Sequence, residues 1–200
     1  MKRFLMIAAA STLVTGALFA QSAPPIQPND PNTVNARREN QQDRIANGVA
    51  SGQLIAGETS NLEAREANLN REVRDDRQDN GGKLTGSELQ QVNEQQARLN
   101  KSIYADKHNA AQQNYKGEVG ARQENQQDRI AQGIRSGQMT AGEAGRAENN
   151  QKGFNQQIHT DRAANGGKLT GSELAQVNRE ENRTSHQIYR EKHNGARQQK

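Results

Sequence analysis

The chain contains two copies of one unit. Residues 36–115 align on residues 121–200 at a constant offset of 85 positions without a gap, and about half of the aligned positions are identical. Blocks such as ENQQDRIA, NGGKLTGSEL and KHN occur in both copies. A gap-free duplication predicts that both repeats form the same elements in the same order, so any fold proposed for one must serve the other.

Each repeat is predicted to form three helices. Glycines separate segments rich in Ala, Gln, Glu, Arg and Leu, residues that favour helix, and no proline follows Pro31. In the first repeat we expect helices at about residues 35–50, 57–78 and 86–111, with equivalents 85 positions later. The fold class is therefore all-α, and short connections favour two tandem three-helix units, each a short antiparallel bundle.

Apolar residues recur along these segments at intervals of three and four, which places them on one face of a helix. The predicted core positions of the first repeat are Ile45, Val49, Leu62, Leu69, Val73, Leu89, Val92, Gln96, Leu99 and Ile103. The second repeat has Ala147 for Leu62, Glu181 for Gln96 and Thr184 for Leu99. We expect it to be the less stable unit unless it packs on its neighbour or on a partner, because each large buried aliphatic contributes about 1.5–3 kcal/mol.

The N-terminus is typical of an export signal. A basic pair and then an uncharged apolar run occupy residues 1–20, and a Pro/Asn-rich linker is predicted over residues 21–35. Cleavage after Ala20 or after Ala23 would suit the small residues there. The alternative is an uncleaved anchor, although the run falls short of the roughly 20 apolar residues that a spanning helix needs. The product is expected to be periplasmic or secreted, with no membrane contact after cleavage.

The charge pattern argues against nucleic-acid binding. The chain has 27 Lys and Arg against 23 Asp and Glu, and the two signs alternate at short range, so no run of cations is available for phosphates. The chain is also very hydrophilic, with a mean hydropathy of −1.14 and 3% aromatic residues. That composition leaves a hydrophilin-like stress protectant as one alternative function.

The repeated NGGKLTGSEL is predicted to join two helices. Its glycine pair can adopt positive φ where a helix ends, and Thr85 with Glu88 forms a capping box for the next helix. Thr170 and Glu173 repeat this arrangement. The other joint of the second repeat, SGQMTAGE, has a similar box in Thr140 and Glu143, whereas its counterpart SGQLIAGE has Ile55 at the capping position. That joint should be the weaker one.

The same stretch resembles an EF-hand calcium loop. DRQDNGGKLTGSE has an acidic start, an amide at the fifth place, a glycine and a closing glutamate. If Gly82 is the loop glycine, Arg77 falls on the first ligand position; if Asp76 is the first ligand, the loop is one residue too long. The resemblance implies, as an alternative function, weak calcium binding by Asp76, Asn80, Glu88, Asp161, Asn165 and Glu173.

A second resemblance covers both repeats. The pattern R-I-x-x-G-x-x-S-G-x-L-T-x-x-E, a G-x-L-T-x-x-E joint and an I-Y-x-x-K-H-N end is matched by RIANGVASGQLIAGE and IYADKHN, with Ile55 departing from the threonine. It is similar to exported bacterial tandem-repeat helical proteins with degenerate EF-hand-like joints. The resemblance implies a helical fold and export, and it carries no established activity.

No catalytic constellation is evident. The chain has no cysteine, and the serines of the joints stand beside glycine, where turn formation explains them. His108 and His193 close the third helices, where a cationic or polar residue complements the helix dipole. Tyr104 and Tyr189 precede them by four positions, and two such residues per repeat fall short of a metal site. We expect a protein without enzymatic activity or cofactor that acts through a protein or cell-envelope partner.

Overall fold

The computed structural model describes residues 31–198. Every element of regular secondary structure in that range is an α-helix. The predicted signal peptide and residues 21–30 of the predicted linker lie outside the described residues. The all-α fold class is confirmed. The helices are α1 Pro31–Ala50, α2 Ala56–Asp79, α3 Gly86–Lys107, α4 Gly117–Ser136, α5 Ala141–Ala164 and α6 Gly171–His193.

The largest differences from the predicted helix ends are at the start of α1 and the end of α3. α1 begins at Pro31, four residues earlier than expected, so residues 31–35 of the predicted linker are helical. Proline suits the first turn of a helix because its missing N–H would have no partner there, and Val34 is buried, at 2% exposure. α3 ends at Lys107, four residues early, because the chain then turns back and the Gln113 N–H donates to the Gly52 carbonyl at 3.0 Å.

The predicted core positions are confirmed. All ten are buried, including the amide side chain of Gln96 on the apolar face of α3. Gln96 is accommodated because its Nε2 donates to the Val34 carbonyl at 2.9 Å, while Gln41 Nε2 donates to the Gln96 carbonyl at 2.8 Å. These bonds satisfy polar groups that burial would otherwise penalise.

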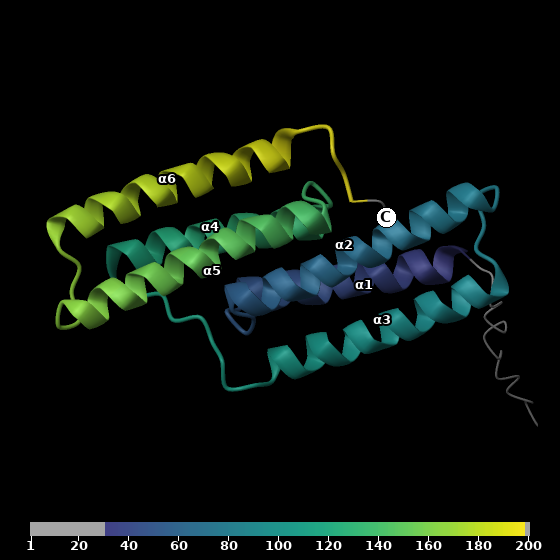
Figure 1. Cartoon of the computed structure of the whole chain (residues 1–200), viewed down its shortest axis with the longest axis horizontal. Coiled ribbons are helices and arrows are strands. Elements are labelled where there is room, and N and C mark those ends of the chain that lie inside the picture. The colour runs from purple at the N-terminus through teal and green to yellow at the C-terminus, as the bar shows by residue number, and fades with distance from the viewer. Residues whose placement is uncertain (1–30, 199–200) are drawn as a thin grey trace, which may run out of the picture.

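The two repeats pack against each other through their first and second helices. The most extensive helix contacts join α2 to α5 and α1 to α4, while α3 lies on α1 and α2, and α6 lies on α4 and α5. Figure 1 shows the result: α3 and α6 lie on opposite outer sides, with the other four helices between them. The outer helices are therefore the elements with most surface available to a partner.

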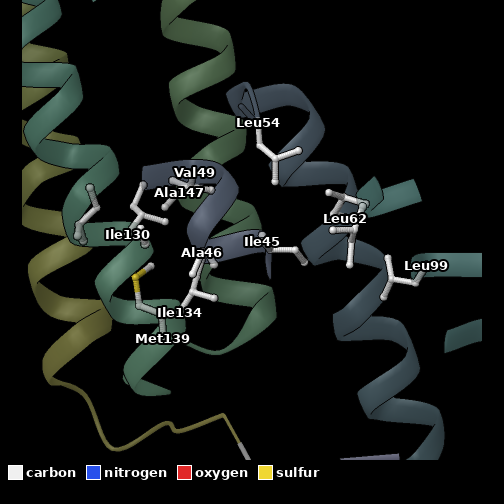
Figure 2. Close-up of a cluster of buried hydrophobic side chains, with 14 residues drawn as sticks. Ile45, Ala46, Val49, Leu54, Leu62, Leu99, Ile130, Ile134, Met139 and Ala147 are labelled. Carbon is white, nitrogen blue, oxygen red and sulfur yellow. The ribbon is translucent and has the colours of Figure 1, made fainter. Parts of the chain in front are cut away.

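The main hydrophobic core belongs to both repeats. Figure 2 shows Ile130 and Ile134 of α4 beside Val49 and Ala46 of α1. The cluster comprises Ile45, Ala46, Val49, Leu54, Leu62, Leu99, Ile103, Ile130, Ala131, Ile134, Met139, Ala144, Ala147 and Ile188. The residue spacing predicts two tandem three-helix bundles, but this cluster joins the two repeats in one core. The small Ala147 is part of the shared core rather than a gap in a separate one.

Each repeat also has a small core of its own at the end remote from the shared cluster. In the first repeat Leu84 of the joint packs against Val34, Leu69, Val73, Leu89 and Val92. In the second, Leu169 packs against Val119, Phe154, Ile158 and Val177. These clusters tie the NGGKLTGSEL joints to the helices that they connect.

Equivalent residues meet across an approximate twofold axis between α2 and α5. Gly142 lies against Ala67, with 3.9 Å between the alanine Cβ and the position that a Cβ would take at Gly142. The equivalent Gly57 lies against Lys152, at 3.4 Å from its Cδ. The duplication has therefore produced a pseudosymmetric chain in which each repeat is packed against its own copy.

Candidate functional site at the helix joints

The first joint of each repeat depends on a close approach between a helix and the residue that follows it. A Cβ at Gly48 would lie 2.6 Å from two carbons of Leu54, and one at Gly133 would lie 2.6 Å from Met139 Sδ. Real Cβ atoms do not come this near to other atoms, so glycine is needed for the chain to fold back here. The glycine of the R-I-x-x-G pattern is thus explained by packing.

The KHN end of each repeat closes the same joint. Asn194 Nδ2 donates to Glu143 Oε1 at 2.6 Å, and Glu143 Oε2 accepts from the Thr140 N–H at 2.9 Å. In the first repeat Asn109 Nδ2 donates to Glu58 Oε1 at 2.7 Å. The distant motifs of the repeat therefore meet in one hydrogen-bond network that connects the end of the third helix to the start of the second.

The joint with Ile55 lacks half of its capping box. The Ile55 N–H donates to Glu58 Oε2 at 3.0 Å, but an isoleucine side chain has no oxygen to accept the N–H of Glu58. In the equivalent joint, Thr140 Oγ1 accepts from the Glu143 N–H at 3.3 Å, which completes the box. The joint predicted to be weaker thus makes one fewer capping bond.

The repeated NGGKLTGSEL also forms complete capping boxes. The Thr85 N–H donates to Glu88 Oε2 at 2.7 Å, and Thr85 Oγ1 accepts from the Glu88 N–H at 3.3 Å. Gly81 and Gly82 have φ of 62° and 92°, a region in which side chains are strained. The hydrogen bond from Thr85 lowers the pKa of the Glu88 carboxyl.

The structure brings the candidate calcium ligands of the first repeat to this joint. Asn80 Nδ2 donates to both Glu88 carboxylate oxygens at 3.0 Å and to the Asp76 carbonyl at 2.8 Å. Burial and then the nearby negative charge of Glu88 raise the pKa of Asp76. Calcium would need Glu88 to give up its capping bond and Asn80 to present its oxygen instead of its N–H group.

The second repeat has the same arrangement. Asn165 Nδ2 donates to Glu173 Oε1 at 2.9 Å and Oε2 at 3.0 Å, and Thr170 with Glu173 forms the box. Asp161 Oδ1 accepts from Gln157 Nε2 at 2.6 Å. Within residues 31–198 no three His, Cys, Asp or Glu side chains are grouped so that they could hold a metal ion.

Buried glutamates lie where the two repeats meet, and the sequence patterns did not point to them. Glu63 and the equivalent Glu148 are fully buried, and each accepts a hydrogen bond from a buried glutamine of its own repeat, Gln42 at 3.1 Å and Gln127 at 2.9 Å. Burial raises the pKa of Glu148 to about 8 and that of Glu63 well above its ordinary value. The charge of Glu148 also raises the pKa of Glu63, so the two carboxyls interact across the repeat interface.

Each repeat has one further buried acid beside an arginine. Burial raises the pKa of Glu66 to about 7, and the charge of Arg38 opposes the rise. In the second repeat Glu181 Oε2 lies 2.9 Å from Arg122 Nε. The predicted defect at Glu181 is thus offset by an ion pair. Glu66 is equivalent to Gln151, and Glu181 is equivalent to Gln96. The additional buried charge therefore lies at a different position in each repeat.

The outer helices each expose a tyrosine stacked on a histidine. The Tyr104 and His108 rings lie 4.1 Å apart with an interplanar angle of 24°, and Tyr189 and His193 repeat this geometry. The tyrosines are 61% and 59% exposed. The histidine Nδ1 atoms lie 2.7 Å from the carbonyl oxygens of the same tyrosines, which orients each ring. The four-residue spacing puts both side chains on one face of the helix, and the structure shows that the rings stack there.

Comparisons with known proteins do not identify a function for the chain. No family model, curated protein or solved structure gives a significant match to the chain. None of α1 to α6, the helices of the described range, is long and apolar enough to span a bilayer.

Proposed function

We propose that this protein is an exported helical module without enzymatic activity that acts by binding a protein or cell-envelope partner through α3 and α6. The observation that carries the proposal is the pair of exposed Tyr–His stacks. Tyr104, Leu174 and Tyr189 are the large hydrophobic side chains exposed in the described part of the chain, and two of them have this same arrangement. Exposed apolar groups of this size are informative when the core does not need them.

The stacks suit contact with a macromolecule. Tyrosine offers a large amphipathic surface, and a ring already held by His108 or His193 loses little conformational freedom on binding. Lys101 and the equivalent His186 lie one helical turn before the two tyrosines and are exposed, and the charge of Lys101 favours a partner with acidic groups. Because α3 and α6 lie on opposite sides, the protein offers two equivalent contacts (Figure 1).

The remaining polar motifs support a structural role for the joints. The Thr and Glu residues of the repeated loops are engaged in helix caps, and Asn109 and Asn194 are engaged in closing the repeats. A preformed helical fold with a shared core also supports a binding module over a hydrophilin-like protectant, which would act without such packing.

Retention of the mature protein on washed envelope fractions of the producing cell tests this proposal. We expect saturable retention that weakens for Tyr104→Ala or Tyr189→Ala, and that falls further for the double variant than for either alone, because two linked contacts reinforce each other. The control is Gln90→Ala with Gln176→Ala, two exposed changes on the same helices. Equal retention of the tyrosine double variant and the parent would refute the proposal.

A further inference from the structure

One pocket of the protein is lined by four arginines. It measures about 270 Å³ and lies between the repeats, where α1 and α2 face the start of α5 and the segment after α6. Figure 1 shows this final segment leaving α6 and running back towards α2. The arginines are Arg38, Arg71, Arg74 and Arg197, and none of the lining residues is acidic. Three separate segments, α1, α2 and the chain after α6, thus contribute cationic side chains to one hollow.

The arginines differ in how far they are neutralised. Arg38 is 4% exposed, donates to Asn70 Oδ1 at 3.2 Å and lies near Glu66. Arg74 has an ion pair of 3.5 Å with Asp75, but both side chains are more than half exposed, so that pair is weak. The Arg197 guanidinium donates to the Asn194 and Ala196 carbonyls, which leaves its charge uncompensated. A surplus of positive charge therefore faces the pocket.

The fold does not require these arginines, because a Gln or His stands at each equivalent position of the other repeat. The equivalents of Arg38, Arg71, Arg74 and Arg197 are Gln123, Gln156, His159 and Gln112. A pocket of about 410 Å³ at the matching end of the molecule contains Gln123 and His159 together with Asn155 and Gln113. Its cations, Lys116 and Arg162, stand at other positions of the repeat.

This difference is hard to explain by stability alone. The same backbone accepts neutral side chains at all four positions, and like charges gathered around one hollow repel one another. Arg38 also has a structural counterpart, because it accompanies the buried Glu66 in the first repeat. In the second repeat the equivalent buried pair is the neutral Gln123 and Gln151. The arginines are better explained by a ligand that neutralises them.

We propose that the pocket binds a small oxyanion carrying two negative charges, of the phosphate or dicarboxylate class. The planar fork of a guanidinium matches the paired oxygens of both groups. The pocket is smaller than the roughly 300–1,000 Å³ typical of drug-sized ligands, so a compact anion fits it better than a large one. The start of α5 adds its dipole, although the carboxylate of Glu143 in its first turn is engaged with Thr140 and Asn194. This ligand site is independent of the tyrosine contacts proposed above.

Calorimetric titration of the mature protein with inorganic phosphate, and separately with malonate, tests the site. We expect saturable binding of at least one of the two anions. Arg71→Gln with Arg197→Gln should raise the dissociation constant at least about tenfold, because charge-assisted hydrogen bonds are lost. Both side chains are exposed, and each replacement is the residue at the equivalent position of the other repeat, Gln156 for Arg71 and Gln112 for Arg197, so the variant should fold normally. The preferred anion would identify the ligand class.

A second variant and a control separate the pocket from general charge. Arg38→Gln with Glu66→Gln copies the buried pair of the second repeat and should also abolish tight binding while preserving the melting transition. Arg179→Gln with Arg183→Gln removes two exposed charges from α6, away from the pocket, and should leave the affinity unchanged. The proposal is wrong if neither anion binds, if the pocket variants bind like the parent, or if the α6 control loses as much affinity as they do.

Discussion

The hydroxyl group of Ser60 donates a 3.1 Å hydrogen bond to the carbonyl of Gly145, and these two residues occupy the same position in the two repeats. The bond lies where α2 crosses α5, on the approximate twofold axis of the molecule. A Cβ at Gly145 would lie 3.3 Å from Cβ of Glu63 and 3.6 Å from the backbone nitrogen of Ala64. The absence of a side chain at Gly145 therefore allows the two helices to approach closely.

Gly145→Val should lower the free energy of unfolding by about 1–3 kcal/mol, because the added carbons must displace a packed helix. The control is Gly153→Val on the same helix, where no atom lies within 4 Å of the position that a Cβ would take. That change should be neutral or stabilising, since glycine is a poor helix former. Urea unfolding of both variants measures the difference, and equal effects would contradict the close contact at Gly145.

Leu99→Ala should destabilise the whole molecule in one transition, by about 2–5 kcal/mol. Leu99 is 2% exposed and belongs to the core shared by both repeats, so the cavity weakens both. Thr184→Leu, at the half-buried equivalent position, should raise the same transition. Calorimetry would show one peak that moves down or up; two separate peaks in Leu99→Ala, with one unmoved, would mean that the repeats unfold independently.

Stability should fall as the pH rises from about 4.5 to about 8. Burial raises the pKa of Glu66 to about 7 and of Glu148 to about 8, and it raises that of Glu63 as well, so the folded protein binds more protons than the unfolded chain in this range. Stability is then lost as these groups ionise, up to the folded-state pKa values. The groups facing them are Gln42, Gln127 and, at Glu66, Arg38.

Replacing the two facing acids tests that slope. Glu63→Gln with Glu148→Gln should reduce the dependence of the unfolding free energy on pH and raise stability at pH 8, because these two buried carboxyls no longer have to ionise there and only the contribution of Glu66 remains. Chemical denaturation at several pH values measures it. Glu94→Gln, at a side chain that is 57% exposed, is the control and should keep the parent slope. A parent protein that becomes more stable over this interval would disprove the assignment.

Glu88→Gln with Glu173→Gln distinguishes helix capping from calcium binding. A capping box accepts glutamine, so the melting temperature without calcium should barely change, whereas Thr85→Ala should lower stability by about 1 kcal/mol through the lost cap. Millimolar calcium should leave the melting temperature of the parent unchanged, because Glu88 and Asn80 are already bonded to each other. A calcium-dependent rise that the double glutamine variant abolishes would instead identify Asp76, Asn80 and Glu88 as ligands.

The residue spacings alone were enough to predict the local structure. Glycine joints, capping pairs such as Thr85 with Glu88, and the three-four spacing of Leu89 to Ile103 all concern neighbours within a few turns, and the helices follow them closely. Helix ends were less predictable where distant contacts decide them. α1 extends to Pro31 because Val34 is buried against residues of α2 and α3, and α3 stops at Lys107 because the Gln113 N–H donates to the Gly52 carbonyl.

The tertiary structure decided how the repeats associate and which side chains meet. Residue spacing within one repeat cannot reveal that Ser60 contacts Gly145, that Glu63 is buried near Glu148, or that arginines from α1, α2 and the final segment line one pocket. The duplication made the two repeats alike, and for that reason their helices could pack against each other as equivalent surfaces. Packing at that interface, which depends on both copies at once, raises the pKa values of the glutamates and brings the arginines together.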